Sequence, residues 1–165
     1  EETYLRIISA KTAELFAAAS KVGAILSEKK SKEKEALEFY GRNLGLTFQI
    51  ADDTLDYNSE LKLFGKKIGN DFYEGKITLP IILLFQKADH AEKEKLRKIF
   101  LNNNREESDL KYTLSLIKKY DIINKCYQKA HHYINLASNS LSVFNECEEK
   151  NILENLTSFS LSRDF

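Results

Sequence analysis

A scarcity of helix-breaking residues is the feature that most limits the folds open to this chain. It has one proline and six glycines in 165 residues, which is too few for the many turns of a β protein. Apolar residues recur instead at helical spacing. The sequence therefore predicts an all-α protein, with long helices over about residues 2–28 and 32–57 and shorter ones over about 91–101 and 109–119.

Three further helices follow from the same pattern. One begins near Thr78 and Pro80, because proline is tolerated in the first turn of a helix. The other two cover about residues 121–143 and 147–162. Between about residues 58 and 79 lies the only long segment without a helical pattern, and its glycines and lysines make it a candidate binding loop.

Composition excludes several classes of function. Twenty-five basic residues balance twenty-five acidic ones, so no overall charge attracts nucleic acid or an anionic membrane. No apolar run reaches the roughly 18 residues of a membrane span. The two cysteines, Cys126 and Cys147, are too few for a disulfide framework and fit reduced thiols. We expect a cytoplasmic protein without a nucleic-acid partner or a transmembrane segment.

Three carboxylates, Asp52, Asp53 and Asp56, interrupt an apolar stretch of the second long helix. On a helical wheel Asp52 and Asp56 share a narrow strip with Gln49, between two apolar arcs, and Asp53 lies at its edge. Burying such charges is costly unless a cation compensates them. Hard oxygen ligands on one face of a helix suit Mg²⁺, so the run predicts a metal site.

Two glycines extend this strip toward the start of the helix. Gly41 and Gly45 lie on the same side as the aspartates when the helix is projected down its axis. A glycine adds no side chain to a helix surface, and we expect the two positions to leave room for a ligand beside the carboxylates.

Lysines beside glycines supply the opposite charge. Lys66 follows Gly65, and Lys76 follows Gly75; such loops bring ammonium groups and backbone N–H donors close to an anion. Lys11 is a further charged residue inside an otherwise apolar helix, where a lone lysine ordinarily reaches to the surface. Acid groups for a metal and lysines for an anion together describe a metal–diphosphate site.

These motifs resemble those of the trans-prenyltransferase family, the head-to-tail isoprenyl (polyprenyl) diphosphate synthases. The resemblance rests on Lys11-Thr12, on Phe48-Gln49 through Asp56, and on the segment from Gly65-Lys66 to Pro80. Their order and spacing are most similar to those of the long-chain bacterial members, such as the octaprenyl diphosphate synthases. The resemblance implies an all-α bundle of the isoprenoid-synthase type, usually a homodimer, that joins isopentenyl diphosphate to an allylic diphosphate with Mg²⁺.

The resemblance also implies roles for individual residues. The metal ligands would be the three aspartates of the second aspartate-rich motif, Asp52, Asp53 and Asp56. Three lysines would bind the allylic diphosphate, namely Lys11, Lys66 and Lys76. Thr12, Gln49 and the main-chain carbonyl of Lys11 would stabilise the allylic carbocation.

One departure from the family pattern is large. No first aspartate-rich motif of the form Asp-Asp-x-x-Asp precedes Asp52, and nothing matches the family's basic residues for isopentenyl diphosphate. Residues 1–165 therefore look like the C-terminal half of a single prenyl diphosphate synthase domain. We expect the complete enzyme to make a long-chain polyprenyl diphosphate for a quinone side chain, and this half alone to be inactive.

Two other functions are compatible with a helical chain of this kind. Heteromeric prenyl synthases contain non-catalytic helical subunits that lost their aspartate motifs, but this chain retains all three aspartates and the loop lysines. Terpene cyclases on a related fold usually carry a different second metal motif, rich in Asn, Ser and Glu, which the sequence lacks.

Overall fold

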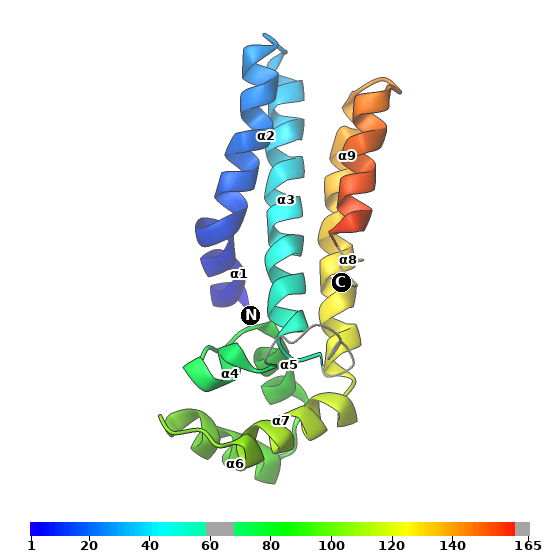
Figure 1. Ribbon diagram of the computed structural model, residues 1–165. Helices are drawn as coiled ribbons and strands as arrows, with labels where there is room; N and C mark the ends of the chain where they lie inside the picture. The colour runs from blue at the N-terminus through cyan, green and yellow to red at the C-terminus, as the bar shows by residue number, and fades with distance from the viewer. Residues whose placement is uncertain (59–67, 161–165) are drawn as a thin grey trace. The chain divides into compact units, whose positions relative to one another are not determined.

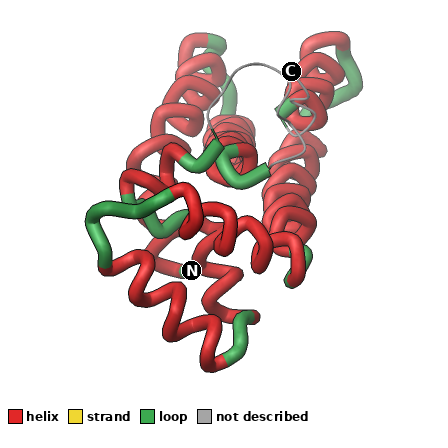
Figure 2. Tube along the Cα trace, turned by 60° about the horizontal axis from the view of Figure 1, so that its bottom comes forward, coloured by secondary structure: helices red, strands yellow, loops and turns green. Residues whose placement is uncertain are grey.

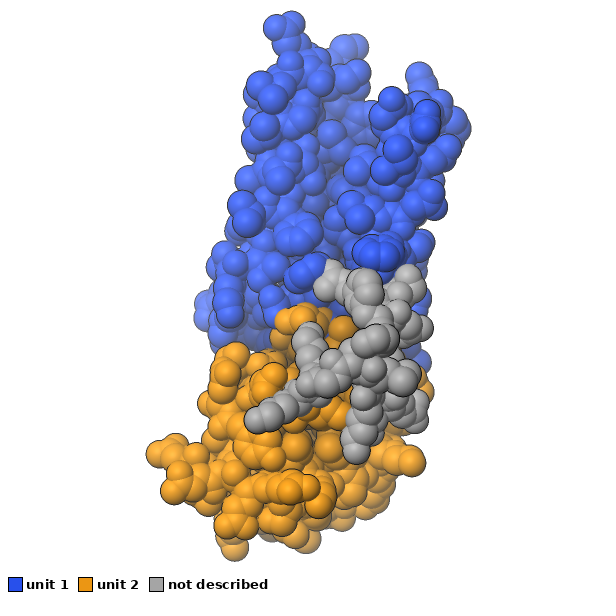
Figure 3. Space-filling model, in the orientation of Figure 1, with its two compact units in different colours: residues 1–51, 128–164 blue, residues 52–127, 165 orange. Residues whose placement is uncertain are grey.

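The computed structural model describes residues 1–58 and 68–160, and the regular elements in these ranges are all helices (Figure 2). The chain divides into two compact units (Figure 3). Unit 1 comprises residues 1–51 and 128–164, and unit 2 comprises residues 52–127 with residue 165. The predicted all-α class is confirmed.

Unit 1 begins with three consecutive helical segments that together confirm the first predicted helix. These are α1 (Glu2–Ile8), a π-helical segment η1 (Ser9–Ala13) and α2 (Glu14–Leu26). The chain then reverses, and α3 (Ser31–Leu55) runs back beside α2 (Figure 1). The π-helical segment was not predicted, because one irregular turn hardly changes the periodicity of a long apolar helix.

Two glycines set how closely α3 approaches the preceding helical segments. A Cβ atom on Gly41 would lie 2.3 Å from the carbonyl oxygen of Phe16, and one on Gly45 would lie 2.6 Å from the Cα atom of Ala13. Both distances are far below ordinary van der Waals contact. The expectation that these glycines leave room for a ligand is therefore wrong, because the backbone of the neighbouring helix fills the space.

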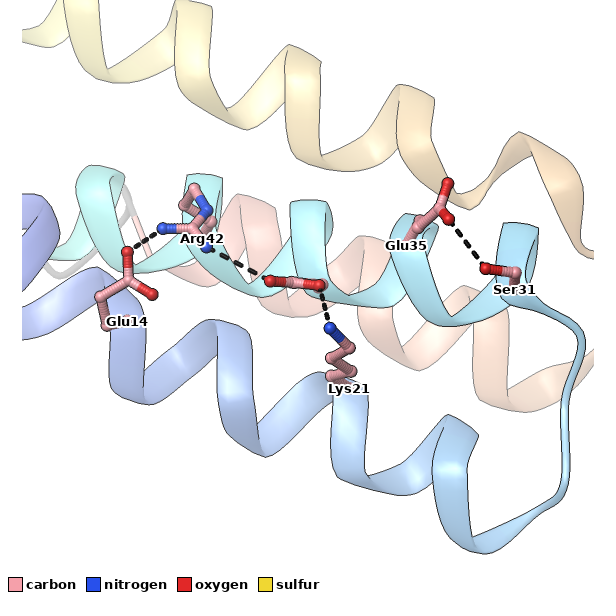
Figure 4. Close-up of polar contacts among 6 residues, drawn as sticks. Glu14, Lys21, Ser31, Glu35 and Arg42 are labelled. Atoms are coloured by element: carbon pink, nitrogen blue, oxygen red, sulfur yellow. Dashed lines mark hydrogen bonds and ion pairs between the residues drawn. The ribbon is translucent and has the colours of Figure 1, made fainter.

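Ion pairs link the exposed edges of α2 and α3 (Figure 4). Arg42 pairs with Glu14 and, at 3.4 Å, with Glu38. The Nζ atom of Lys21 lies 2.6 Å from Oε2 of Glu38. Partly exposed pairs of this kind each contribute about 0–1 kcal/mol, so they supplement the helix packing without dominating it.

The rest of unit 1 comes from the C-terminal part of the chain. α8 (Ile122–Ser140) continues into a 3₁₀ turn η3 (Leu141–Val143), and α9 (Glu148–Phe159) returns beside α8 (Figure 1). Residues 122–127 of α8, like residues 52–55 of α3, belong to unit 2. The core of the unit joins side chains from α2, α3, α8 and α9 with those that follow α8: Tyr40, Leu44, Ala137 and Leu141, flanked by Phe16, Leu37, Phe144 and Leu153. Within the described residues, no helix combines the length and the apolar character that crossing a membrane requires.

The described part of unit 2 contains four shorter helices: α4 (Asn70–Glu74), α5 (Leu79–Lys87), α6 (His90–Leu101) and α7 (Glu107–Lys119). Pro80 lies in the first turn of α5, as predicted. α6 begins with a capping box, in which the side chains of Asp89 and Glu92 each accept a hydrogen bond from the other residue's backbone N–H. At the start of α7 the Asp109 side chain accepts from the backbone N–H of Glu106. Three aromatic rings pack in sequence in this unit, with centroids 5.5 Å apart for Phe72 and Phe100 and 6.2 Å apart for Phe85 and Phe100.

Candidate functional site

The predicted site residues are divided between the two units. Unit 1 contains Lys11, Thr12 and Gln49. All three are candidates for carbocation stabilisation, and Lys11 is also a candidate for binding the diphosphate. Unit 2 contains the predicted metal ligands and a second diphosphate ligand, Asp52, Asp53, Asp56 and Lys76. Lys66 lies outside the described residues.

A hydrogen bond joins two of the unit 1 candidates. Lys11 and Thr12 lie in the π-helical segment, a local irregularity that is frequent at functional sites. The Thr12 hydroxyl donates to Oε1 of Gln49 over 2.8 Å. Because its oxygen accepts this bond, the Gln49 amide directs its NH₂ end away from Thr12. The Lys11 side chain is exposed.

The three aspartates lie at the end of α3 in three different environments. Asp52 is exposed, whereas Asp53 is only 5% exposed. Their difference follows from helix geometry, which turns adjacent side chains by about 100°. Asp56 is half-buried and follows Leu55, the last residue of the helix. Among the described residues, no group of three acidic, histidine or cysteine side chains is arranged to hold a metal ion.

Asp56 holds the start of α4. Its carboxylate accepts hydrogen bonds from the backbone N–H groups of Asn70, at 3.1 Å, and Asp71, at 2.8 Å. Its main-chain carbonyl accepts a third from the N–H of Gly69, at 2.9 Å. Burial raises the pKa of the Asp56 carboxyl above its ordinary value, and the hydrogen bond from the Asp71 N–H only partly offsets this effect.

Lys76 is connected to the same short helix. Its ammonium group lies 2.7 Å from Oε2 of Glu74 and 3.0 Å from Oδ1 of Asp71, and its side chain is 51% exposed. The hydrogen bonds to Glu74 and Asp71 raise the pKa of Lys76, so it stays cationic. Asp56, Asp71 and Lys76 thus form one connected series that joins the aspartate motif to the lysine motif.

The sequence did not predict α4 or the role of Asp71. The helix has five residues, which is too short for a periodic signal. Its only sequence markers are the two glycines that bracket it, Gly69 (φ 85°) and Gly75 (φ 74°). Both adopt the left-handed backbone conformation that favours glycine, so a paired-glycine spacing was the one signal that could have located the helix.

Known proteins are similar to this chain over its whole length. The Polyprenyl synthetase family matches residues 1–117. A "Short chain isoprenyl diphosphate synthase" of Methanothermobacter thermautotrophicus is 35% identical over 164 residues, which cover 99% of this chain and 50% of that protein. The "Octaprenyl diphosphate synthase" of Haemophilus influenzae is 29% identical over 165 residues, covering 100% of this chain and 50% of the relative.

Solved structures of polyprenyl synthases are also similar to this chain. The crystal structure of a polyprenyl synthase from Caulobacter crescentus CB15, complexed with calcium and isoprenyl diphosphate, superposes with a TM-score of 0.92 and 38% identity. The match covers 100% of this chain and 50% of the Caulobacter chain. This chain thus spans about half the length of the relatives that it matches. It belongs to the polyprenyl synthetase family.

Proposed function

We propose that this chain is the C-terminal half of a polyprenyl diphosphate synthase, which adds isopentenyl diphosphate units head-to-tail to an allylic diphosphate. One observation carries the proposal: in a chain of this family, the aspartate motif is connected through Asp71 to Lys76. The acidic residues for the metal and the lysine for the diphosphate would thereby be held in fixed positions relative to each other. The complete enzyme would be a cytoplasmic homodimer with a long-chain product that serves as a quinone side chain.

The aspartates at the end of α3 fit Mg²⁺ by their donor chemistry. Mg²⁺ retains several waters and takes one or two carboxylates together with substrate phosphates, so it does not require a closed cluster of protein ligands. Asp52 is exposed and would be the principal ligand, with Asp53 and Asp56 acting directly or through water. When bound, the metal would supply positive charge that stabilises the departing diphosphate.

The three lysines, Thr12 and Gln49 would act on the substrate itself. Lys11, Lys66 and Lys76 would bind the allylic diphosphate as cations. Lys76 would exchange a carboxylate partner for a phosphate oxygen, which its half-exposed position allows. Thr12 and Gln49 are already joined by a hydrogen bond. Together with the Lys11 carbonyl, they would direct the negative, oxygen ends of their dipoles toward the allylic cation.

Exposed apolar residues on α2 support the proposal that further chain packs against unit 1. Leu15 and Leu26 are 74% and 79% exposed, and Val22 is also exposed. Apolar patches of this kind commonly mark interaction sites. The family's first aspartate motif and the basic residues for isopentenyl diphosphate would belong to that further half, so residues 1–165 alone would be inactive.

The proposal can be tested in a chimera. Residues 1–165 would replace the matching half of the Caulobacter crescentus synthase, to which they are 38% identical. With an allylic diphosphate, labelled isopentenyl diphosphate and Mg²⁺, we expect a labelled polyprenyl product that EDTA abolishes. Asp52→Asn should reduce its formation by at least about 100-fold, through lost stabilisation of the leaving group.

Controls separate catalysis from scaffolding. Glu107→Gln removes an exposed carboxylate on α7, whose side chain is 74% exposed, and should leave the rate unchanged. Residues 1–165 alone should yield no product. A chimera that is folded by circular dichroism but inactive would contradict the proposal, and a fully active Asp52→Asn chimera would favour a non-catalytic subunit instead.

A further inference from the structure

Unit 2 contains a cavity of about 380 Å³, a size typical of sites for small molecules. Its apolar wall comes from α7 and the start of α8, with Leu114, Ile117 and Ile123. Asp121, Asn124 and Tyr57 also line the cavity. Of the predicted site residues that the structure describes, none lines this cavity, so the inference drawn from it is separate from the site proposed above.

Tyr57 is the unusual member of this lining. Its side chain is 1% exposed, and its hydroxyl has no hydrogen-bond partner among the residues that the structure describes. Most buried polar groups in proteins are paired, and an unpaired one is unfavourable. A ligand that offers an acceptor to this hydroxyl would relieve that cost. Because the hydroxyl is itself buried, a ligand would reach it as the lining side chains shift.

Asp121 provides a charged polar group on the same cavity. Its backbone has φ 53°, in the left-handed region that aspartate and asparagine tolerate better than most residues. The Asn124 side-chain amide donates to Oδ1 of Asp121 over 2.7 Å. Both residues are exposed at the turn between α7 and α8, where the Asp121 carboxylate can also accept a hydrogen bond from a ligand.

We propose that this cavity binds a small uncharged molecule with a hydrogen-bond acceptor for Tyr57, an apolar body and a hydrogen-bond donor for Asp121. The apolar body would pack on Leu114, Ile117 and Ile123. A carboxamide on a single ring has all three features in a volume that the cavity accommodates. This inference does not depend on the proposed enzyme activity, since it rests on unit 2 alone.

The probe is 4-fluorobenzamide, titrated into the 165-residue chain with ¹³C-labelled Leu and Ile methyl groups. We expect saturable shifts at Leu114, Ile117 and Ile123 with a dissociation constant in the millimolar range. Fluorobenzene, which lacks the carbonyl and the amide, should bind more weakly. Tyr57→Phe should weaken 4-fluorobenzamide binding about fivefold, the factor that corresponds to one hydrogen bond.

Two further variants make the test decisive. Tyr73→Phe removes an exposed hydroxyl elsewhere in unit 2 and should leave the affinity unchanged. Asp121→Asn tolerates the same backbone conformation and should weaken 4-fluorobenzamide relative to fluorobenzene even if Tyr57→Phe folds poorly. The absence of saturable methyl shifts, or equal affinity of the wild type and both cavity variants for the amide, would overturn the proposal.

Discussion

The two units of this chain treat buried polar groups differently. In unit 1 the buried Tyr40 hydroxyl donates to the carbonyl oxygen of Leu153 over 2.8 Å, and the Thr12 hydroxyl donates to Gln49. In unit 2 three buried side-chain atoms lack a partner: the Tyr57 hydroxyl, the Thr78 hydroxyl and Nε of Arg105. Across the described ranges 1–58 and 68–160, all such atoms lie in unit 2.

The positions of these unpaired atoms indicate why the units differ. Tyr57 directly follows Asp56, and Thr78 lies two residues after Lys76. Natural proteins violate the rules of polar pairing mostly at functional sites. Among the described residues, unit 1 pairs its buried polar side-chain atoms, whereas unit 2 leaves groups unpaired at the cavity that Tyr57 lines and close in sequence to Lys76.

The largest expected effect tests the close helix contact of unit 1. Gly41→Ala should lower the free energy of unfolding by about 3 kcal/mol, because the new methyl group would collide with the Phe16 carbonyl. Urea denaturation followed by circular dichroism measures this change. Gly23→Ala, at an exposed helical position with no atom within 4 Å of the new Cβ, should instead raise stability by about 0.5–1 kcal/mol. Equal effects at both glycines would show that the contact is not tight.

An arginine in each unit allows the next comparison. Arg105 donates to the carbonyl oxygens of Tyr73, at 3.2 Å, and Phe100, at 2.8 Å. Arg105→Ala should cost about 2 kcal/mol, because two carbonyl groups lose a charged donor. Arg42→Ala in unit 1 breaks only partly exposed ion pairs and should cost about 0.5 kcal/mol. Urea denaturation measures the free energy of unfolding of both variants. A larger loss for Arg42→Ala than for Arg105→Ala would contradict this expectation.

Two buried tyrosines provide the most direct test of pairing. Tyr40 and Tyr57 are both 1% exposed, but of the two only Tyr40 has a partner for its hydroxyl within the described part of the chain. Tyr40→Phe should lower the free energy of unfolding by about 1 kcal/mol, since the Leu153 carbonyl loses its donor. Tyr57→Phe should leave stability unchanged or raise it by up to about 1 kcal/mol.

Residue-resolved amide hydrogen exchange measures the tyrosine variants in each unit separately. Tyr40→Phe should increase exchange in α3 and α9, whereas Tyr57→Phe should not increase exchange in unit 2. A destabilising Tyr57→Phe would mean that the hydroxyl is paired in solution, and the contrast between the units would then be lost.

Sequence periodicity predicted most of the fold because the long helices repeat their apolar positions over many turns. α3 extends over 25 residues, and a period of 3.6 is unmistakable at that length. α4, with five residues, offers hardly more than one period. Gly41 and Gly45 were misinterpreted for another reason: a missing side chain leaves a space, and only the packed structure reveals that a neighbouring backbone fills it.

The candidate site was predictable by residue type but not by contact. Carboxylates and lysines at family spacing select Asp52, Asp56 and Lys76 as candidates, because a metal–diphosphate site would need those charges. That Asp56 also holds α4 depends on a hydrogen bond across 15 residues, to the N–H of Asp71. Such a contact arises from the path of the chain through paired left-handed glycines, which local sequence patterns do not specify.

The smallest expected effect is a difference in pH dependence between the units. In unit 1 the hydrogen bond from Lys21 lowers the pKa of Glu38 below its ordinary value of 4.5. Its contribution to stability is therefore present above pH 4.5 and is lost as the pH falls through the folded-state pKa. In unit 2 burial raises the pKa of Asp56 above 3.8. Its contribution is present below pH 3.8 and is lost as the pH rises through the folded-state pKa.

Neutral variants should therefore respond to pH in opposite directions. Between about pH 3 and 6 in metal-free buffer, Asp56→Asn should gain stability relative to the wild type as the pH rises, because the wild type must ionise a half-buried carboxyl group. Glu38→Gln should lose stability relative to the wild type over the same range, because it cannot form the charged pair with Lys21. Urea denaturation of both variants at several pH values measures the two slopes. Slopes of the same sign would show that the carboxylates of the two units are stabilised alike, and that Asp56 is not held at a desolvation cost beside the proposed metal site.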